Sequence, residues 1–99
     1  MQGRATIAPE ILESYAADAA CEVEGVRGLV ESTLPRHKGV RVVDDGGRVR
    51  VELHIAIEWG ASITEVGREV QRRVAAYLQQ MANVEPDAVD VIVDEIGPV

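Results

Sequence analysis

The sequence predicts an α+β fold, a two-layer sandwich in which two helices cover one face of a mixed β-sheet, with element order β-α-β-β-β-α-β. β-branched residues are abundant, and two stretches of helical periodicity interrupt stretches in which apolar and polar residues alternate. One-sided helices and a one-sided sheet bury their apolar sides most simply against each other. The chain has 99 residues, enough for one small core, so we expect a single domain over residues 1–99.

The first part of the chain alternates short elements with glycine and proline breaks. A short apolar stretch, residues 4–8, is expected to form the first strand. Pro9 suits a first helical turn, where its missing N–H costs nothing, and apolar residues recur every three or four positions up to Val23. Gly25 is a natural helix end because glycine adopts left-handed backbone without a clash. The resulting predictions are a helix over about 9–24, a strand over 26–31 and a loop over 32–39.

The most regular segment is residues 48–59, where apolar and polar side chains alternate without a break. A period of two over a dozen residues predicts a long strand with one buried and one polar face. A shorter strand, 40–43, precedes it. The intervening turn, residues 44–47, reads Asp-Asp-Gly-Gly, which is typical of a tight hairpin. A calcium loop needs oxygen ligands at alternate positions over twelve residues, and the segment around this turn does not have that pattern.

A second helix and a last strand complete the prediction. Ser62 and Glu65 have the spacing of a capping box, an apolar stripe follows, and Asn83 is a plausible stop. A final strand alternates around residues 89–94. If it runs parallel to the strand over 48–59, the helix between them forms a crossover connection, which we expect to be right-handed.

Composition and charge exclude several classes of protein. With 10 basic and 17 acidic residues, the formal net charge is -7, which argues against nucleic-acid binding. A single cysteine forms no internal disulfide and points to the cytosol. The N-terminus leads into no long apolar run, so we expect no signal peptide and no direct insertion into a membrane.

The polar face of the long strand carries one set of candidate chemical groups. Glu52, His54 and Glu58 are metal ligands or acid–base groups in principle. Side chains two positions apart on a strand lie about 7 Å apart, which is loose for one metal ion. We therefore favour a solvated face in which Arg48 and Arg50 pair with these groups.

The segment from Gly25 to Gly28 matches the GxxG loop of KH domains, which clamps a nucleic-acid backbone. A KH loop joins two helices in basic surroundings, whereas here a strand is expected to follow and the chain is acidic. A helix end followed by a strand is favoured, and a KH-like nucleic-acid-binding module remains the alternative function.

Other candidates are surface groups. Cys21 lies on the side of the first helix opposite its apolar stripe, and no His or Lys lies one turn away to activate it. Residues 36–38, Arg-His-Lys, are the densest basic run and are expected in a solvated loop. Arg68 and Arg72 form a second basic patch, with glutamates at helical spacing as partners. The residues we take as candidates for an interaction surface are Trp59, Arg68, Arg72 and Cys21.

No Ser/His/Asp or Cys/His constellation, P-loop or dinucleotide fingerprint occurs in the sequence. With two histidines and three aromatic side chains, a catalytic pocket or cofactor cradle is hard to assemble. We therefore expect no catalytic residue, no bound cofactor and no metal site.

Several strings in order resemble the alkaline shock protein family, also called envelope stress response proteins. They are GRATIAPE from Gly3, EVEGV from Glu22, IEWG from Ile57 and VDVIV from Val89. The similarity spans about residues 3–97. Trp59 stands where a Tyr is expected, and no extension follows Val99, so functions of longer tails are not implied.

The resemblance implies a small, cytoplasmic, non-enzymatic bacterial protein linked to cell-envelope homeostasis. Some members of the family are held near the membrane by a separate membrane-anchored partner, and some self-associate. For this chain, the resemblance implies an interaction or scaffold protein that acts through homo-oligomers or through such a partner and is peripheral to the membrane only in that way. It supplies no catalytic residue.

Overall fold

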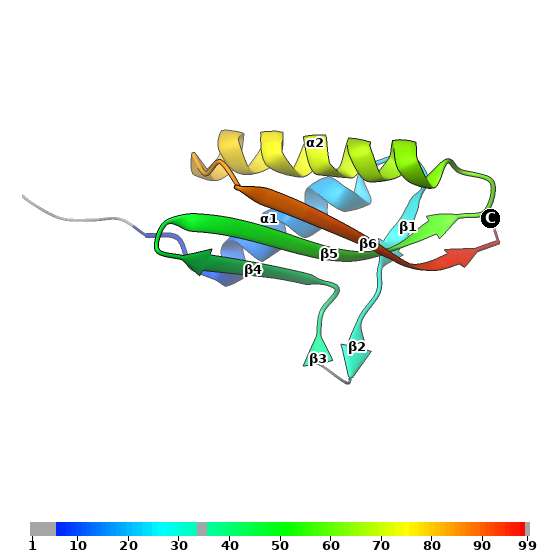
Figure 1. Ribbon diagram of the computed structural model, residues 1–99, viewed down its shortest axis with the longest axis horizontal. Coiled ribbons are helices and arrows are strands. Elements are labelled where there is room, and N and C mark those ends of the chain that lie inside the picture. The colour runs from blue at the N-terminus through cyan, green and yellow to red at the C-terminus, as the bar shows by residue number, and fades with distance from the viewer. Residues whose placement is uncertain (1–5, 34–35, 99) are drawn as a thin grey trace, which may run out of the picture.

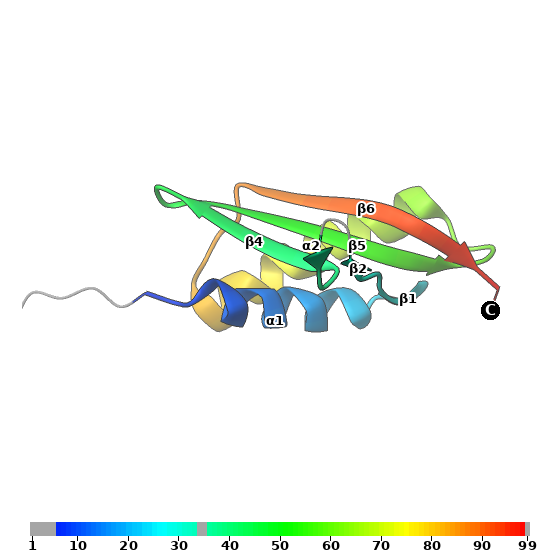
Figure 2. The same ribbon diagram turned by 90° about the horizontal axis from the view of Figure 1, so that it is seen from below.

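A computed structural model of the chain describes residues 6–33 and 36–98 and places two helices on one face of a mixed sheet (Figures 1 and 2). This two-layer α+β arrangement confirms the predicted fold class. The elements are α1 (Pro9–Cys21), β1 (Val26–Leu29), β2 (Ser32–Thr33), β3 (Arg36–His37), β4 (Val40–Asp45), β5 (Arg48–Glu58), α2 (Ile63–Ala82) and β6 (Ala88–Gly97).

β5 is the central strand, and every other strand of the main sheet pairs with it. β6 runs parallel to β5, from the pair Arg50–Ala88 to the pair Glu58–Gly97, as the predicted crossover requires. β4 and β1 pair antiparallel with successive parts of β5. The backbone of His54 bonds both Val30, just after β1, and Gly39, just before β4, so β1 and β4 share one side of β5. The main sheet therefore has two outer edges, β4 with β1 on one side and β6 on the other.

The core lies between the sheet and the helices. On β5 the apolar members of the alternating pattern are buried, with Leu53 and Ile55 fully enclosed. Helix α2 contributes the fully buried Val70, Val74 and Leu78. Tyr15 of α1 and Tyr77 of α2 pack edge to face, with ring centroids 5.8 Å apart. The apolar residues of the alternating strand and those of the helical stripe therefore pack against each other in one core, as predicted.

In the second half of the chain, the structure also confirms the predicted start and end of the second helix and the predicted hairpin turn. The Ser62 hydroxyl accepts a hydrogen bond from the Glu65 N–H at 3.3 Å, and Asn83 ends α2 in left-handed backbone with φ 54°. In the β4–β5 hairpin, the Gly47 N–H donates to the Asp44 carboxylate at 3.0 Å. The hairpin turn thus sets the start of β5, and the caps set the two ends of α2.

Three expectations for the first half of the chain were wrong. Residues 6–8 form no strand, and residues 4 and 5 lie outside the described part. Helix α1 ends at Cys21 rather than near residue 24, and the Val23 N–H bonds back to the Ala20 carbonyl at 3.2 Å. The predicted loop over 32–39 contains the short hairpin β2–β3, which pairs apart from the main sheet and projects away from it (Figure 1).

Candidate interaction surfaces

The face of the sheet opposite the helices carries a row of ion pairs that crosses three strands. Arg41 on β4 lies 3.3 Å from Glu52 on β5, and Arg50 on β5 lies 3.0 Å from Asp90 on β6. Glu52 also contacts the imidazole of His54. Arg50, Glu52 and His54 are therefore engaged with one another or with neighbouring strands. The predicted partners were wrong, because Arg50 pairs with Asp90 of β6 and, among the described residues, Arg48 forms no ion pair with Glu52, His54 or Glu58.

His54 bonds a carboxylate at each ring nitrogen. Nδ1 lies 2.7 Å from the Asp94 carboxylate, and Nε2 lies 3.0 Å from the Glu52 carboxylate. Desolvation lowers the pKa of His54, but the hydrogen bonds and charges of Asp94 and Glu52 outweigh it, and the net pKa is raised. An imidazolium can donate from both nitrogens, so this geometry suits the charged form.

The suggested set of metal ligands is not brought together. Glu52 and His54 meet, but Glu58 lies at a different place, on the wall of the pocket described next. Within residues 6–33 and 36–98, no group of three or more His, Cys, Asp and Glu side chains is arranged to hold a metal ion. The disfavoured alternative, a metal site on this face, has no geometric support among the described residues.

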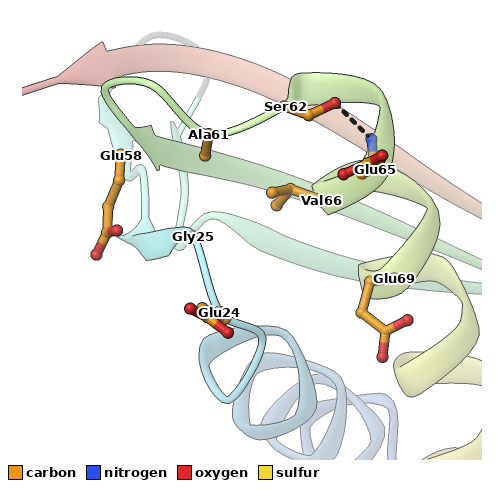
Figure 3. A pocket seen from close by; sticks show the side chains of 8 residues that line it. All are labelled: Glu24, Gly25, Glu58, Ala61, Ser62, Glu65, Val66 and Glu69. Carbon is orange, nitrogen blue, oxygen red and sulfur yellow. Dashed lines mark hydrogen bonds between the residues drawn. The ribbon is translucent and has the colours of Figure 1, made fainter.

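An acidic pocket lies between the α1–β1 turn, the end of β5 and the first turns of α2 (Figure 3). Its volume is about 500 Å³. Figure 3 shows carboxylates from three separate segments around it. The lining residues are Glu24, Gly25, Glu58, Ala61, Ser62, Glu65, Val66 and Glu69. The sequence reading missed this pocket, because its members come from three segments whose approach depends on tertiary packing.

Gly25 belongs to the pocket wall and has a packing role. Its φ is 99°, and a Cβ there would lie 2.8 Å from a methyl group of Val66 on α2. Gly28 lies within β1 and pairs with Ala56. The Gly25–Gly28 segment thus joins a helix to a strand beside carboxylates, unlike a KH loop between two helices.

The two outer edges of the sheet differ in protection. On β4, the Val42 N–H donates to the Glu13 carboxylate of α1 at 3.1 Å, so a helix side chain caps that edge. β6 pairs with β5 alone. Among the described residues, the one side chain that bonds the β6 backbone is Gln71, whose amide donates to the Val89 carbonyl at 3.0 Å.

Exposed apolar side chains gather where β5 and β6 end and α2 begins. Trp59 is 70% exposed, Ile63 is 46% exposed and Ile96 is 47% exposed. The Trp59 N–H donates to the Gly97 carbonyl at 2.6 Å, which fixes the β5–α2 turn against the end of β6. We call Trp59, Ile63 and Ile96 the apolar end.

The other candidate surface residues lie elsewhere. Arg72 bonds Glu69 at 2.6 Å, as predicted from helical spacing, and with Arg73 it lowers the pKa of that carboxyl. Arg68 is exposed one turn earlier on α2. Cys21 is exposed at the end of α1, and desolvation together with the Asp18 charge raises the pKa of its thiol, which disfavours the reactive thiolate. The four residues therefore belong to three different segments.

Comparison with solved structures identifies the fold. The chain has the α+β fold of the structure MamM-CTD 215-293, with a TM-score of 0.58 and 17% identity over 87% of this chain and 96% of that one. A likeness at this identity establishes the fold alone.

Sequence comparison then identifies the family. The family model described as ASP23 family, cell envelope-related function, matches residues 1–98, so the chain belongs to the ASP23, or alkaline shock protein, family. It is 31% identical to YqhY of Bacillus subtilis over 101 residues, which cover 90% of this chain and 73% of YqhY. It is 23% identical to YloU of the same bacterium, over 95% of this chain and 88% of YloU. In the described part of the chain, no helix combines the length and apolar character needed to cross a bilayer.

Proposed function

We propose that this protein is a single-domain, non-enzymatic interaction protein that serves the cell envelope from the cytoplasm. The observation that carries the proposal is the apolar end. A tryptophan that is 70% exposed, beside two half-exposed isoleucines, is the kind of surface from which binding hot spots are built. Membership of a family with a cell envelope-related function supports the setting.

The polar groups of the molecule are consistent with a binding role. Both ring nitrogens of His54 are bonded by carboxylates, which leaves neither as a ready general base. The acidic pocket is lined by carboxylates, one serine and apolar groups, and that serine caps α2. The pocket therefore lacks a paired nucleophile and base.

The proposed partner is a protein at the cytoplasmic side of the membrane, either a membrane-anchored protein or further copies of this chain. Attachment to the membrane is through that partner. In either case we expect the apolar end to be buried in the complex, since covering an exposed tryptophan removes a large apolar surface from water.

The test is retention of envelope proteins by the full chain, compared with Trp59→Ala. We expect the wild type to retain a specific protein and Trp59→Ala to weaken retention about tenfold or more, as for a binding hot spot. Val43→Ala is the matched control, because Val43 is 40% exposed on β4, away from the apolar end. A wild type that sediments as a monomer at high concentration and retains no envelope protein would overturn the proposal.

A further inference from the structure

The outer edge of β6 presents free backbone groups in a defined register. The Asp87 N–H bonds the Val49 carbonyl at 2.7 Å, and pairing with β5 continues from Ala88 onward. The backbone of His54 bonds the β1 and β4 side, so the odd-numbered residues of β5 face β6. In a parallel pair, a facing residue bonds the two residues that flank its partner, so Ala88, Asp90 and Ile92 bond β5. Val89, Val91 and Val93 therefore direct their N–H and C=O groups away from the sheet, and the Gln71 amide of α2 already bonds the Val89 carbonyl. A register shift after Val93 ends this regular stretch.

The space beside this edge is open on the helix side. Val89, Val91 and Val93 face α2 but are only partly buried. A Cβ added at Gly67, one helical turn before Gln71 on the flank of α2 that reaches β6, would meet no atom within 4 Å. An additional strand at this edge would cover the exposed parts of the three valines.

The edge is also strongly acidic. Residues 84–98 contain no Lys, Arg or His and contain five exposed acidic residues, Glu85, Asp87, Asp90, Asp94 and Glu95. Arg50 and His54 on β5 pair with Asp90 and Asp94, and the Asp87 carboxylate accepts the Val49 N–H. Among the described residues, no cation is paired with Glu85 or Glu95, so the segment keeps negative charge. A second β6 edge would bring like charges together, whereas a basic strand would complement them.

We propose that the β6 edge over residues 88–93 binds an extended, Lys- or Arg-bearing segment of the partner protein by adding it to the sheet as a further strand. The inference rests on the proposed function and names the chemistry of the partner. Outward backbone groups of Val91 and Val93, with the N–H of Val89, supply the pairing. Apolar side chains of the segment cover Val89 and Val91 beside α2, and its basic side chains lie on the opposite face near the aspartates.

The probe is a labelled ten-residue peptide in which lysine alternates with valine, titrated against the full chain. We expect saturable binding that weakens with salt, with amide chemical-shift changes and slower amide exchange confined to residues 88–93. Two control peptides separate the contributions. Replacing lysine by glutamate removes the charge match, and N-methylation of alternate backbone nitrogens removes the hydrogen bonds, so both are expected to lose binding.

The matched variants are Val91→Pro and Val91→Ile. Proline removes the outward N–H of residue 91 and is tolerated on an edge strand at such a position, so it should weaken peptide binding about tenfold, while isoleucine keeps the backbone group. If Val91→Pro does not fold, Asp90→Asn with Glu95→Gln tests the charge match and should weaken binding and flatten its salt dependence.

The outcomes are distinct. Equal binding of the lysine and glutamate peptides, shifts centred on Trp59, or no binding at low salt would each overturn the inference. Association of the protein with itself that Val91→Pro abolishes would identify a second copy as the occupant and would also overturn it. If the peptide fails but an envelope protein is retained through Trp59, the proposed function stands and this inference alone falls.

Discussion

The two edges of the main sheet differ in how their unpaired backbone groups are protected. An edge strand exposes unpaired backbone groups that can pair with another chain. On β4, helix α1 sends Glu13 to bond the outward N–H of Val42 at 3.1 Å. On β6, no carboxylate among the described residues bonds an outward N–H, and the segment around the strand carries five acidic and no basic residues. One edge is closed by the protein itself, and the other is left open but selective in charge.

Leu53→Ala has the largest expected effect because both edges depend on β5. Leu53 is fully buried and pairs with Val40 on β4 and Val91 on β6. We expect a loss of about 3 kcal/mol in the free energy of unfolding, from lost burial and the remaining cavity. Urea unfolding measures it. The exposed Val43→Ala should change stability by less than about 0.5 kcal/mol, and equal effects of the two changes would contradict the two-layer core.

Gly39→Ala tests the closed side, where the chain enters β4. Gly39 has φ 85°, and a Cβ there would lie 2.8 Å from the Leu29 Cβ and 3.0 Å from the Val30 carbonyl oxygen. We expect a destabilisation of about 2 kcal/mol from backbone strain and crowding. Gly46→Ala is the matched control, with φ 62° and no atom within 4 Å of an added Cβ. If the two variants unfold alike, crowding at the β1–β4 junction is not significant.

Glu13→Ala removes the side chain that closes the β4 edge. Without it the Val42 N–H has no acceptor, and we expect a loss of about 1 kcal/mol together with faster exchange of the Val42 amide hydrogen. Glu13→Gln keeps an acceptor oxygen and should preserve most of the protection. Unchanged Val42 exchange in Glu13→Ala would mean that packing of α1, and not the carboxylate, closes this edge.

The features that could be read from the sequence are those encoded within a few residues. Alternation over 48–59, the Ser62 cap and the Asn83 stop are local signals, and the structure confirms all three, except that β5 ends at Glu58 and Trp59 is exposed. The β2–β3 hairpin was missed because two-residue strands leave no period to detect. The end of α1 was misplaced because the Gly25 signal reflects contact with Val66 and not a helix cap.

The interaction surfaces could not be predicted, because a single sequence does not show which distant residues pair in the fold. The Glu13–Val42 bond joins residues 29 positions apart, and the His54–Asp94 bond joins residues 40 positions apart. The sequence placed His54 on a polar face correctly, but its partner on β6 depends on the register between the two strands. The same holds for the acidic pocket, whose glutamates come from segments that are far apart in the sequence.

The smallest expected effect is a pH dependence that distinguishes the two edges. The pKa of His54 is raised from its ordinary value of 6.5 in the folded protein, against desolvation, by hydrogen bonds and charges from Asp94 and Glu52. A raised pKa means that the protonated form stabilises the fold. This contribution is fully present below the unfolded pKa and is lost as pH rises through the higher folded pKa.

Because Asp94 lies at the irregular end of β6, loss of the proton should loosen that edge more than β4. We expect the free energy of unfolding to fall as pH rises through the folded pKa, and amide exchange corrected for intrinsic rate to increase around residues 93–97 before it does in β4. His54→Gln should flatten this dependence. A dependence that persists in His54→Gln, or that affects β4 first, would show that the charge on His54 does not hold the open edge to β5.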